Sequence, residues 1–438
     1  MFTTYSALMT DFSGLDSDDT WSFKNIKRSD TSYITHSYHR YPAKFIPQIV
    51  QKCIKEFTNP GDLVLDPFGG CGTTLVESKV LGRKSIGFDI NPVAKFITDV
   101  KTRPIDIFKL DNSYTKFKEI TKKKVINKHI VHSERTKYWF DPKTLKQLDK
   151  IYQDILQIKD VHIRKFYLCA FSQILKNSSK WLMKSTKPQI DPNKKTREVL
   201  PIYIKHLKGM INKNYEFYSI LEKNNNLRIS SKMKLLDSTK KFPLATNSVD
   251  MIVTSPPYVT SYEYADLHQL TLHWFGDDVI RYPRWKRYVE NYSKFRSNFV
   301  GTQYILENSN IDLLSKEAIY IVRNLNINKN KKVKSIYKYF LDMQQSFKEM
   351  YRVLRSNGYI CIIIGNTEIG GVNIKNAEAT TEQLLNLGFN IKQVVKRELS
   401  NKMITSWRDK SNGKFSNKNK RGSKRIYNYE FVIIGQKI

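Results

Sequence analysis

The sequence lacks the features that would place it among metal-binding, disulfide-rich or membrane proteins. No Cys-x-x-Cys pair is present, so neither a zinc site nor a disulfide framework is indicated, and we expect no metal. No apolar run reaches the length of a membrane span, and the polar, acidic stretch 1–19 does not resemble a signal peptide. We therefore expect a cytoplasmic protein without a membrane partner. The four cysteines are Cys53, Cys71, Cys169 and Cys361.

Acidic residues are also scarce relative to basic ones. The chain has 41 Asp and Glu against 74 Lys and Arg, which gives a formal net charge of +33. So large a surplus points to a polyanionic partner, most simply a nucleic acid, although a solvated basic surface is the alternative. With 438 residues, 40% of them hydrophobic, the chain is long enough for two or three domains with sizeable cores.

A glycine-rich loop near residue 70 lacks the full Gly-x-Gly-x-x-Gly pattern of dinucleotide-binding folds. It lies between a short apolar strand, 63–65, and a helix opened by Thr73, and a second strand, 85–88, ends at Asp89. An acid about 20 residues beyond the glycines is where such folds hold a pair of ribose hydroxyls. Asp66 would repel a pyrophosphate and suits a cationic amino group better, so S-adenosylmethionine is favoured over NAD. A structural turn in another α/β protein is the alternative.

The stretch Thr254-Ser255-Pro256-Pro257-Tyr258 follows a buried strand, 249–253. The two prolines end the strand, because they have no N–H and a fixed φ. The carbonyls of Ser255 and Pro256 then remain free to accept hydrogen bonds, and Tyr258 offers an aromatic face. This arrangement suits an exocyclic amino group on a flat base. Taken alone, the tetrapeptide could equally be an ordinary proline-rich turn.

The remaining chain divides around these two motifs into five predicted segments. They are an arm and cofactor-binding half at 1–102, a helical insertion at 103–230, a catalytic half at 231–275, a basic insertion at 276–335 and a C-terminal part at 336–438. We expect 1–30 to be an irregular arm and 280–335 to be irregular as well. The helical insertion could lie against DNA or form a cap with a solvated basic face. Either insertion could read the target.

Two shorter patterns complete the prediction. A strand over 234–236 leads to Asp237, which could accept a hydrogen bond from an adenine amino group or serve as a turn residue. Near the C-terminus we expect a helix stopped by Asn357-Gly358, a strand over 359–364 and a loop over 396–426.

Together the motifs resemble the amino-group (cytosine-N4 or adenine-N6) DNA methyltransferases of restriction–modification systems. The segment 36–47 is similar to the family's extended motif over the methionine part of the cofactor. The segment 66–73 is similar to its cofactor loop, usually Asp-Pro-Phe-x-Gly-Ser-Gly-Thr, with Cys71 where Ser is common. The segment 255–258 matches the catalytic loop. Its Ser form is typical of cytosine-N4 enzymes, and Asp or Asn forms are typical of adenine-N6 enzymes.

The resemblance implies an α/β, Rossmann-like S-adenosylmethionine-dependent methyltransferase fold, a mostly parallel sheet with helices on both faces and a helical insertion. It implies double-stranded DNA as partner, a separately encoded restriction endonuclease as a further one, and a bacterial or archaeal cytoplasm. The candidate catalytic residues are Ser255, Pro256, Pro257 and Tyr258. The candidate cofactor-binding residues are Tyr41, Phe45, Asp66, Pro67, Phe68, Gly70, Gly72, Thr73, Thr74, Asp89, Ile90, Asp237 and Ser238.

The expected chemistry requires the target base to leave the duplex stack, because its amino group is engaged in pairing. Ser255 and the Pro256 carbonyl would accept the amino hydrogens, Tyr258 would stack on the ring, and methyl transfer would be direct. No cysteine lies in the Pro-Cys context of a cytosine-C5 nucleophile. An RNA methyltransferase, or a nucleic-acid-binding protein with a decayed methyltransferase fold, are the competing interpretations.

Overall fold

The computed structural model describes residues 11–42, 44–123, 130–185, 187–195, 197–259, 264–301, 314–327, 329–330, 332–399, 407–409, 422–425 and 429–438. Its centre is a seven-stranded sheet with the strand order β3-β2-β1-β4-β5-β11-β8. Strands β1 to β5 pair in parallel, and β11 pairs antiparallel with both β5 and β8. The strands are β1 (Leu63–Asp66), β2 (Lys84–Asp89), β3 (Ser231–Leu235), β4 (Val249–Thr254), β5 (Leu354–Ile364), β8 (Phe389–Glu398) and β11 (Tyr429–Lys437).

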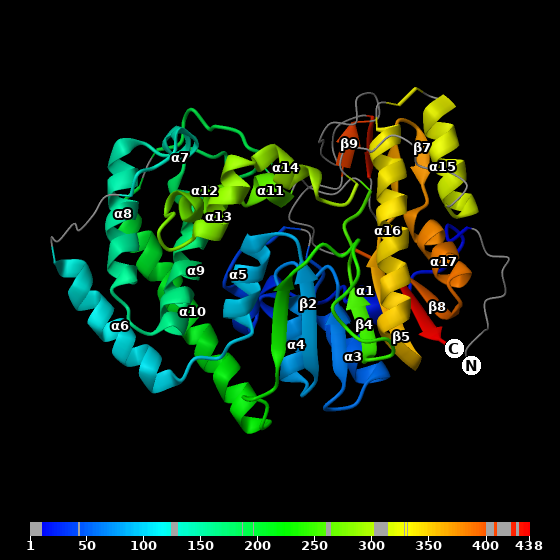
Figure 1. The fold of residues 1–438 in the computed structure, drawn as a ribbon, viewed down its shortest axis with the longest axis horizontal. Coiled ribbons are helices and arrows are strands. Elements are labelled where there is room, and N and C mark those ends of the chain that lie inside the picture. Colours follow the sequence, from blue (N-terminus) through cyan, green and yellow to red (C-terminus); the bar gives the residue numbers. More distant parts are fainter. Residues whose placement is uncertain are drawn as a thin grey trace.

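The central strands are buried on both faces, which explains why they read as continuous apolar runs. Successive side chains of β4 enter different cores: Ile252 joins one cluster, whereas Met251 and Val253 join the other. The mostly parallel sheet with helices against both faces (Figure 1) confirms the predicted α/β, Rossmann-like class.

Different helices cover the two faces of the sheet. Helices α1 (Asp19–Ser22) and α3 (Pro47–Phe57) share a core with Met251 and Val253. Helices α15 (Lys316–Ile327), α16 (Val333–Val353) and α17 (Asn376–Asn386) share the core on the Ile252 face. Helix α4 (Thr73–Val80) packs against α3 and the first three strands, and α5 (Pro92–Lys101) packs against β2 and β3.

A helical lobe stands beside the β3 edge of the sheet (left in Figure 1) and is built from two separate parts of the sequence. Both parts contribute to one aromatic core, which contains Trp139 and Phe171 from the first part and Trp274 and Phe295 from the second. Its helices are α6 (Ile107–Lys122), α7 (Glu134–Trp139), α8 (Pro142–Leu156), α9 (Val161–Ser178), α10 (Val199–Lys223), α11 (Tyr264–Leu267), α12 (Gln269–Asp277), α13 (Pro283–Glu290) and α14 (Tyr292–Ser297).

The expectation of an irregular segment over 280–335 is wrong for its described part, which contains α13, α14 and α15 and the start of α16. In α15 the buried residues Ala318, Ile321, Val322 and Leu325 have helical spacing. In α13 no residue is fully buried, and Lys and Arg are frequent in its sequence. The helical spacing of its few apolar residues is therefore hard to recognise from the sequence alone. Residues 302–313 of this segment lie outside the described part.

The described part of the N-terminal arm, residues 11–30, packs on the folded body, whereas its sequence predicts an irregular arm; residues 1–10 lie outside the described part. Residues Phe12 and Trp21 are 2% and 3% exposed, and the Asp18 amide donates to the Lys396 carbonyl at 2.8 Å. The arm contains two short helices, α1 and α2 (Arg28–Thr31), and is followed by the 3-10 helix η1 (Ile34–Ser37). The irregular spacing of the apolar residues gives no periodic signal, although tertiary packing buries Phe12 and Trp21.

Two further expectations near the C-terminus need correction. Asn357-Gly358 is not a helix stop but lies within β5, where Asn357 has φ +62°, and α16 already ends at Val353. The described part of the expected loop 396–426 contains the end of β8 and an antiparallel pair of short strands, β9 (Trp407–Asp409) and β10 (Ser423–Arg425); residues 400–406, 410–421 and 426 lie outside the described part. A second antiparallel pair joins β6 (Thr367–Ile369) with β7 (Val372–Ile374). No helix in the described part of the chain is long and apolar enough to cross a membrane.

Candidate active site

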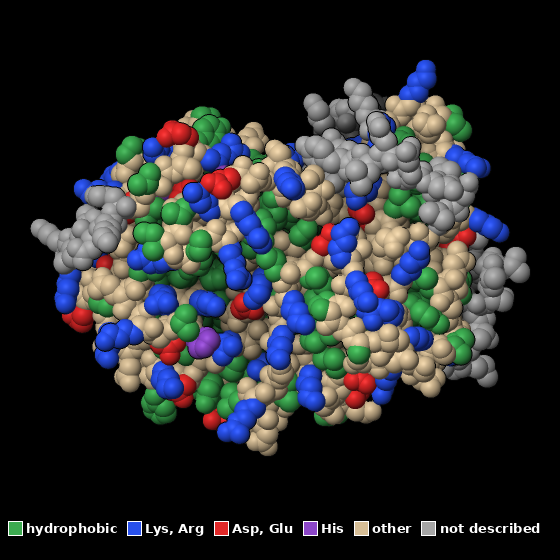
Figure 2. Space-filling model, in the orientation of Figure 1, with side chains coloured by type: hydrophobic (Ala, Val, Ile, Leu, Met, Phe, Trp, Pro, Cys, Tyr) green, Lys and Arg blue, Asp and Glu red, His purple; other side chains and the backbone are tan. Residues whose placement is uncertain are grey.

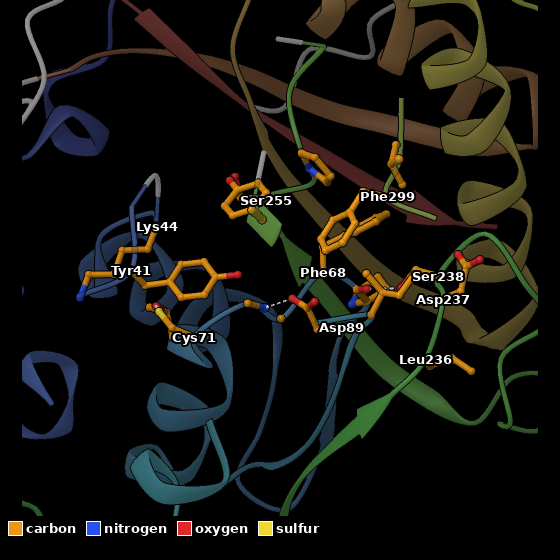
Figure 3. Close-up of a pocket in the computed structure, with 18 of the residues that line it drawn as sticks. Tyr41, Lys44, Phe68, Cys71, Asp89, Leu236, Asp237, Ser238, Ser255 and Phe299 are labelled. Atoms are coloured by element: carbon orange, nitrogen blue, oxygen red, sulfur yellow. Dashed lines mark hydrogen bonds between the residues drawn. The ribbon is translucent and has the colours of Figure 1, made fainter. Parts of the chain in front are cut away.

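A cavity opens where β1, β2, β3 and β4 end (Figure 3). In a parallel α/β sheet the carboxyl ends of the strands meet at one edge, so segments far apart in sequence converge there. The lining residues are Tyr41, Lys44, Phe45, Pro67, Phe68, Gly69, Gly70, Cys71, Thr73, Asp89, Ile90, Leu236, Asp237, Ser238, Ser255, Pro257, Tyr264, Asn298, Phe299 and Val300.

The glycine-rich loop after β1 forms the floor of this cavity. Gly70 and Gly72 have φ values of +48° and +76°, and a Cβ on Gly72 would lie 2.4 Å from Cγ2 of Thr98. Only glycine fits such a position without displacing its neighbour. Below the loop, the fully buried Lys101 donates from Nζ to the Cys71 carbonyl at 2.6 Å. The loop is therefore held mainly through its backbone, and Cys71 in place of Ser leaves that role unchanged.

Asp89, at the end of β2, presents a carboxylate to the cavity. Its Oδ2 accepts from the Gly70 amide at 3.0 Å, and its Oδ1 accepts from the Asn91 amide at 2.7 Å. Burial raises the pKa of Asp89 to about 7. Each carboxylate oxygen has a second lone pair, so Asp89 can still accept from a pair of ligand hydroxyls.

Asp66 lies beneath the cavity rather than in its lining. Its carboxylate is fully buried and accepts from Thr254 Oγ1 and Thr74 Oγ1, both at 2.7 Å, and from the Phe68 amide at 3.1 Å. Burial raises its pKa to about 6. The predicted contact of Asp66 with a cofactor amino group does not fit this placement. Asp66 instead ties the cofactor loop to Thr254, the residue before Ser255.

The segment 36–47 is anchored to helices α4 and α9 through two histidines. His36 Nε2 lies 2.5 Å from Glu77 Oε1 of α4, and His39 Nε2 lies 2.9 Å from Ser172 Oγ of α9. After these two anchors, Tyr41, Lys44 and Phe45 reach the cavity, and Ala43 lies outside the described residues. The Tyr41 ring stacks on Tyr264, with centroids 5.9 Å apart.

On the opposite side, the chain leaving β3 forms a second wall. The Leu236 amide donates to the Asp89 carbonyl at 3.0 Å, which continues the strand pairing to the cavity edge. Asp237 Oδ1 accepts from the amide and hydroxyl of Thr239 at 2.9 and 2.8 Å. Asp237 is thus both a turn residue and a lining residue. The Ser238 hydroxyl donates to the Pro67 carbonyl.

The Ser255-Pro256-Pro257-Tyr258 segment leaves β4 at the mouth of the cavity. Ser255 and Pro257 line it, whereas Pro256 and Tyr258 do not. The Tyr258 hydroxyl donates to Glu430 Oε1 of β11 at 3.0 Å. Its ring packs against Gly365, where an added Cβ would lie 3.0 Å from the ring carbon Cε2. Burial, with Glu430 nearby, raises the pKa of Tyr258 well above its usual value.

The structure brings most predicted site residues to one cavity and leaves five of them outside its lining. Those five are Asp66, Gly72, Thr74, Pro256 and Tyr258, which support the lining from behind or beside it. Sequence reasoning missed Lys44, Gly69, Cys71, Leu236, Tyr264, Asn298, Phe299 and Val300 as lining residues. Four of these eight, Lys44, Gly69, Cys71 and Leu236, directly adjoin predicted residues and could have been found by extending each motif, whereas Tyr264 adjoins none. Asn298, Phe299 and Val300 had no such signal.

Comparisons with known proteins agree with this geometry. A sequence model of a family of N6 and N4 DNA methylases matches residues 9–99 and 249–437, more than half of the chain. The Type II methyltransferase M.MvaI of Kocuria varians is 25% identical over 389 residues, covering 82% of each chain. The Type II methyltransferase M.BsoBI of Geobacillus stearothermophilus is 26% identical over 404 residues, covering 81% of this chain and 78% of that one.

A solved SAM-dependent methyltransferase from Methanosarcina mazei matches 91% of this chain and 99% of its own, at 10% identity and a TM-score of 0.30. That score is low, so the fold assignment depends on the strand order given above. The extent of the family match, over both the cofactor loop and the Ser-Pro-Pro-Tyr segment, is decisive for identity. The chain belongs to the amino-group DNA methylase family and is a DNA methyltransferase that uses S-adenosylmethionine as its methyl donor.

Proposed function

We propose that this enzyme methylates the exocyclic N4 amino group of a cytosine flipped out of duplex DNA. We further propose that it is the modification enzyme of a restriction–modification system with a separately encoded endonuclease. The observation that carries the base assignment is Ser255, the acceptor residue in front of Pro256 and Pro257, at the mouth of the cavity.

The proposed chemistry follows from the acceptors at this position. A Ser255 oxygen and the Pro256 carbonyl would orient the two amino hydrogens and direct the nitrogen lone pair into the cavity. S-adenosylmethionine supplies an electrophilic sulfonium methyl. Because Ser255 and Asp89 line the same cavity, the two reactants would be held side by side, and positioning would supply most of the rate enhancement. Transfer would be direct, without a covalent enzyme intermediate.

The cofactor roles are proposed from the walls of the cavity. Asp89 would accept from the ribose hydroxyls, because its carboxylate keeps free lone pairs at the end of β2. Tyr41 and Phe45 would cover the methionine part from the side of the extended segment. Ile90 and Asp237 would adjoin the adenine. This placement has the methionine part nearest Ser255 and Tyr41, on the side of Figure 3 opposite Asp237.

Duplex DNA would approach the cavity across a basic surface. Lys and Arg side chains are spread over the face shown in Figure 2, both over the helical lobe and over the sheet, and Asp and Glu are fewer there. Such charges bind phosphates without reading sequence. We propose that the helical lobe takes part in this contact, since α11 to α14 connect it directly to the mouth of the cavity.

The test is to incubate the protein with labelled S-adenosylmethionine and mixed-sequence duplex DNA, and to identify the labelled nucleoside by mass. We expect N4-methylcytosine. Label in N6-methyladenine would refute the base assignment. This outcome should be checked first, because a 71-residue stretch of the chain is 35% identical to the DNA adenine methyltransferase YhdJ of Escherichia coli. Label in RNA alone would refute the DNA substrate.

A matched pair of variants tests the role of Ser255. Ser255→Ala removes the proposed acceptor and should lower kcat roughly 100-fold, by analogy with loss of one transition-state hydrogen bond, while the Kd for S-adenosylmethionine stays unchanged. The control is Ser248→Ala, an exposed serine just before β4 whose hydroxyl donates to the Ala245 carbonyl at 2.7 Å. The control should keep full activity. Equal losses of turnover and cofactor binding in Ser255→Ala would contradict the acceptor role.

A further inference from the structure

Residues Asn298 to Gly301, here called the strap, cross from the helical lobe to the sheet at the cavity. Phe299 packs on the lobe core, with its ring centroid 5.2 Å from that of Phe295. Val300 packs instead on the core between the sheet and α16. Asn298, Phe299 and Val300 all line the cavity. The strap therefore joins two separate hydrophobic cores at the edge of the cavity proposed to hold the cofactor.

The far end of the strap is fixed on α16. The Gly301 amide donates to Asp342 Oδ2 at 3.2 Å. Gly301 has φ +70°, and an added Cβ would lie 3.1 Å from Cβ of Tyr339, so the backbone approaches the helix as closely as glycine allows. These contacts give the strap a defined path rather than that of a free surface loop.

The same helix holds the segment 236–238, on the side of the cavity proposed for the adenine. Ser346 of α16 donates to the Ser238 carbonyl at 2.8 Å, one helical turn from the residue that holds Gly301. The strap and the segment 236–238 thus share one support. Figure 3 agrees with this: Phe299 lies toward Ser238 and Asp237, on the side away from Tyr41 and Lys44.

We propose that Phe299 and Val300 form an apolar wall that packs against the adenine ring of S-adenosylmethionine, across the cavity from Ile90. The inference rests on the proposed placement of the ribose at Asp89 and is independent of which DNA base is methylated. Phe299 offers the aromatic face, and every purine has a π-face that stacks on such a ring. Because α14 carries the strap, the helical lobe would contribute directly to cofactor binding.

The experiment is calorimetric titration of the full-length protein without DNA, using S-adenosylmethionine and 5′-methylthioadenosine as separate ligands. The second ligand keeps the adenine and ribose but lacks the amino acid. Phe299→Ala should weaken both ligands by about the same factor, roughly 5- to 100-fold, the range for loss of one aromatic–base stack. Phe299→Leu, which preserves apolar packing against Phe295, should weaken both by a smaller factor.

The matched control is Tyr288→Ala on α13. Tyr288 also packs edge-on against Phe295, with centroids 5.0 Å apart, but does not line the cavity. It should leave both Kd values unchanged while perturbing the lobe core to a similar extent. Thermal melting of each variant shows whether it folds, and Phe299→Leu carries the test if Phe299→Ala does not fold.

Three results would overturn the proposal. Unchanged Kd values in Phe299→Leu and Phe299→Ala, with a raised KM for DNA, would assign Phe299 to the target-base pocket. Weakening of S-adenosylmethionine without weakening of 5′-methylthioadenosine would place the strap at the methionine end. If Tyr288→Ala weakened the binding of both ligands as much as Phe299→Ala does, the loss of affinity would be explained by reduced stability of the helical lobe. None of these readouts depends on the methylated base, so failure of the cytosine assignment is detected separately.

Discussion

The contact between Tyr258 and Glu430 makes the sharpest prediction about the catalytic loop. Glu430 shares its carboxylate between two partners: Oε1 accepts from the Tyr258 hydroxyl at 3.0 Å, and Oε2 accepts from Arg397 at 2.6 Å. Arg397 is itself buried and donates from Nε to the Trp21 carbonyl at 2.9 Å. The tyrosine that follows the two prolines is therefore tethered through β11 and β8 to the N-terminal arm. We expect this tether to fix the plane of the Tyr258 ring.

Tyr258→Phe removes the tether and keeps the ring, and Glu430→Gln keeps an acceptor and removes the charge. A hydrogen bond to a charged group contributes about 1.5–3 kcal/mol, and the Glu430 side chain, 15% exposed, is partly screened by water. We therefore expect a coupling free energy of about 1–2 kcal/mol between the two positions. The single substitution Glu430→Gln should cost more, because it also weakens a largely buried ion pair with Arg397.

The assay is a double-mutant cycle on two quantities, the free energy of unfolding in urea and kcat on duplex DNA. Tyr258→Phe should lower kcat about 3- to 10-fold at an unchanged Kd for S-adenosylmethionine, since Tyr258 does not line the cofactor cavity. Tyr359→Phe, an aromatic on β5 stacked on Phe57 with centroids 4.5 Å apart, is the control and should not couple to Glu430. A coupling free energy of zero between Tyr258 and Glu430 in kcat would refute the positioning role, even if stability couples.

The other predictions concern Asp66, Asp89 and Gly72. Asp66→Ala leaves three donors without their acceptor and should lower the free energy of unfolding by about 3–5 kcal/mol. Asp66→Asn should lower it less. If the Ala variant kept its stability but failed to bind S-adenosylmethionine, the original prediction that Asp66 contacts the cofactor would be restored. Asp89 accepts hydroxyls best when ionised, so the affinity for 5′-methylthioadenosine should rise with pH through about 7, by at most tenfold per unit, and Asp89→Asn should abolish that dependence. The same raised pKa means that the folded state binds the proton more tightly than the unfolded chain does, so the contribution of Asp89 to stability is greatest below about pH 4 and is lost as pH rises through 7. Gly72→Ala should lower the Tm by several degrees because of its positive φ and the 2.4 Å approach to Thr98, and Gly209→Ala on α10, with open space around it, should raise the Tm slightly.

The parts of the site that could be predicted are those at strand ends. Asp89 and Ser255 follow apolar runs directly, and parallel strands bring their carboxyl ends together without any further information. The glycine loop was equally predictable from the sequence, because positive φ values and the close approach of neighbouring atoms restrict the residue type at Gly70 and Gly72. These constraints act between residues close together in the chain, and such local constraints can be recognised from the sequence.

The parts that escaped prediction depend on partners far away in the sequence. Asp66 was expected to face a ligand because its neighbours gave no sign that Thr254, 188 residues later, would take up its acceptor capacity. Glu430 and Arg397 meet only because β11 and β8 pair in a register that places Glu430 opposite Arg397. Phe299 reaches the cavity from a segment whose basic composition concealed the preceding helices α13 and α14. No spacing within any one segment encodes these contacts.

The supporting contacts also explain how the cofactor and the target base, held by different walls of the cavity, could be kept in a fixed position relative to each other. Asp66 bonds both Thr74, at the start of α4, and Thr254, directly before the catalytic loop, so the cofactor loop and Ser255 share one buried carboxylate. On the other side, α16 holds both the Ser238 carbonyl and the Gly301 amide. A displacement of either wall would therefore break hydrogen bonds, three of which are buried, and a buried polar group left unsatisfied costs about 1–3 kcal/mol. Since a misplacement of about 1 Å can cost a methyl transfer roughly 100-fold, these two supports, neither of which needs to touch a ligand, are where substitutions should impair turnover at a distance.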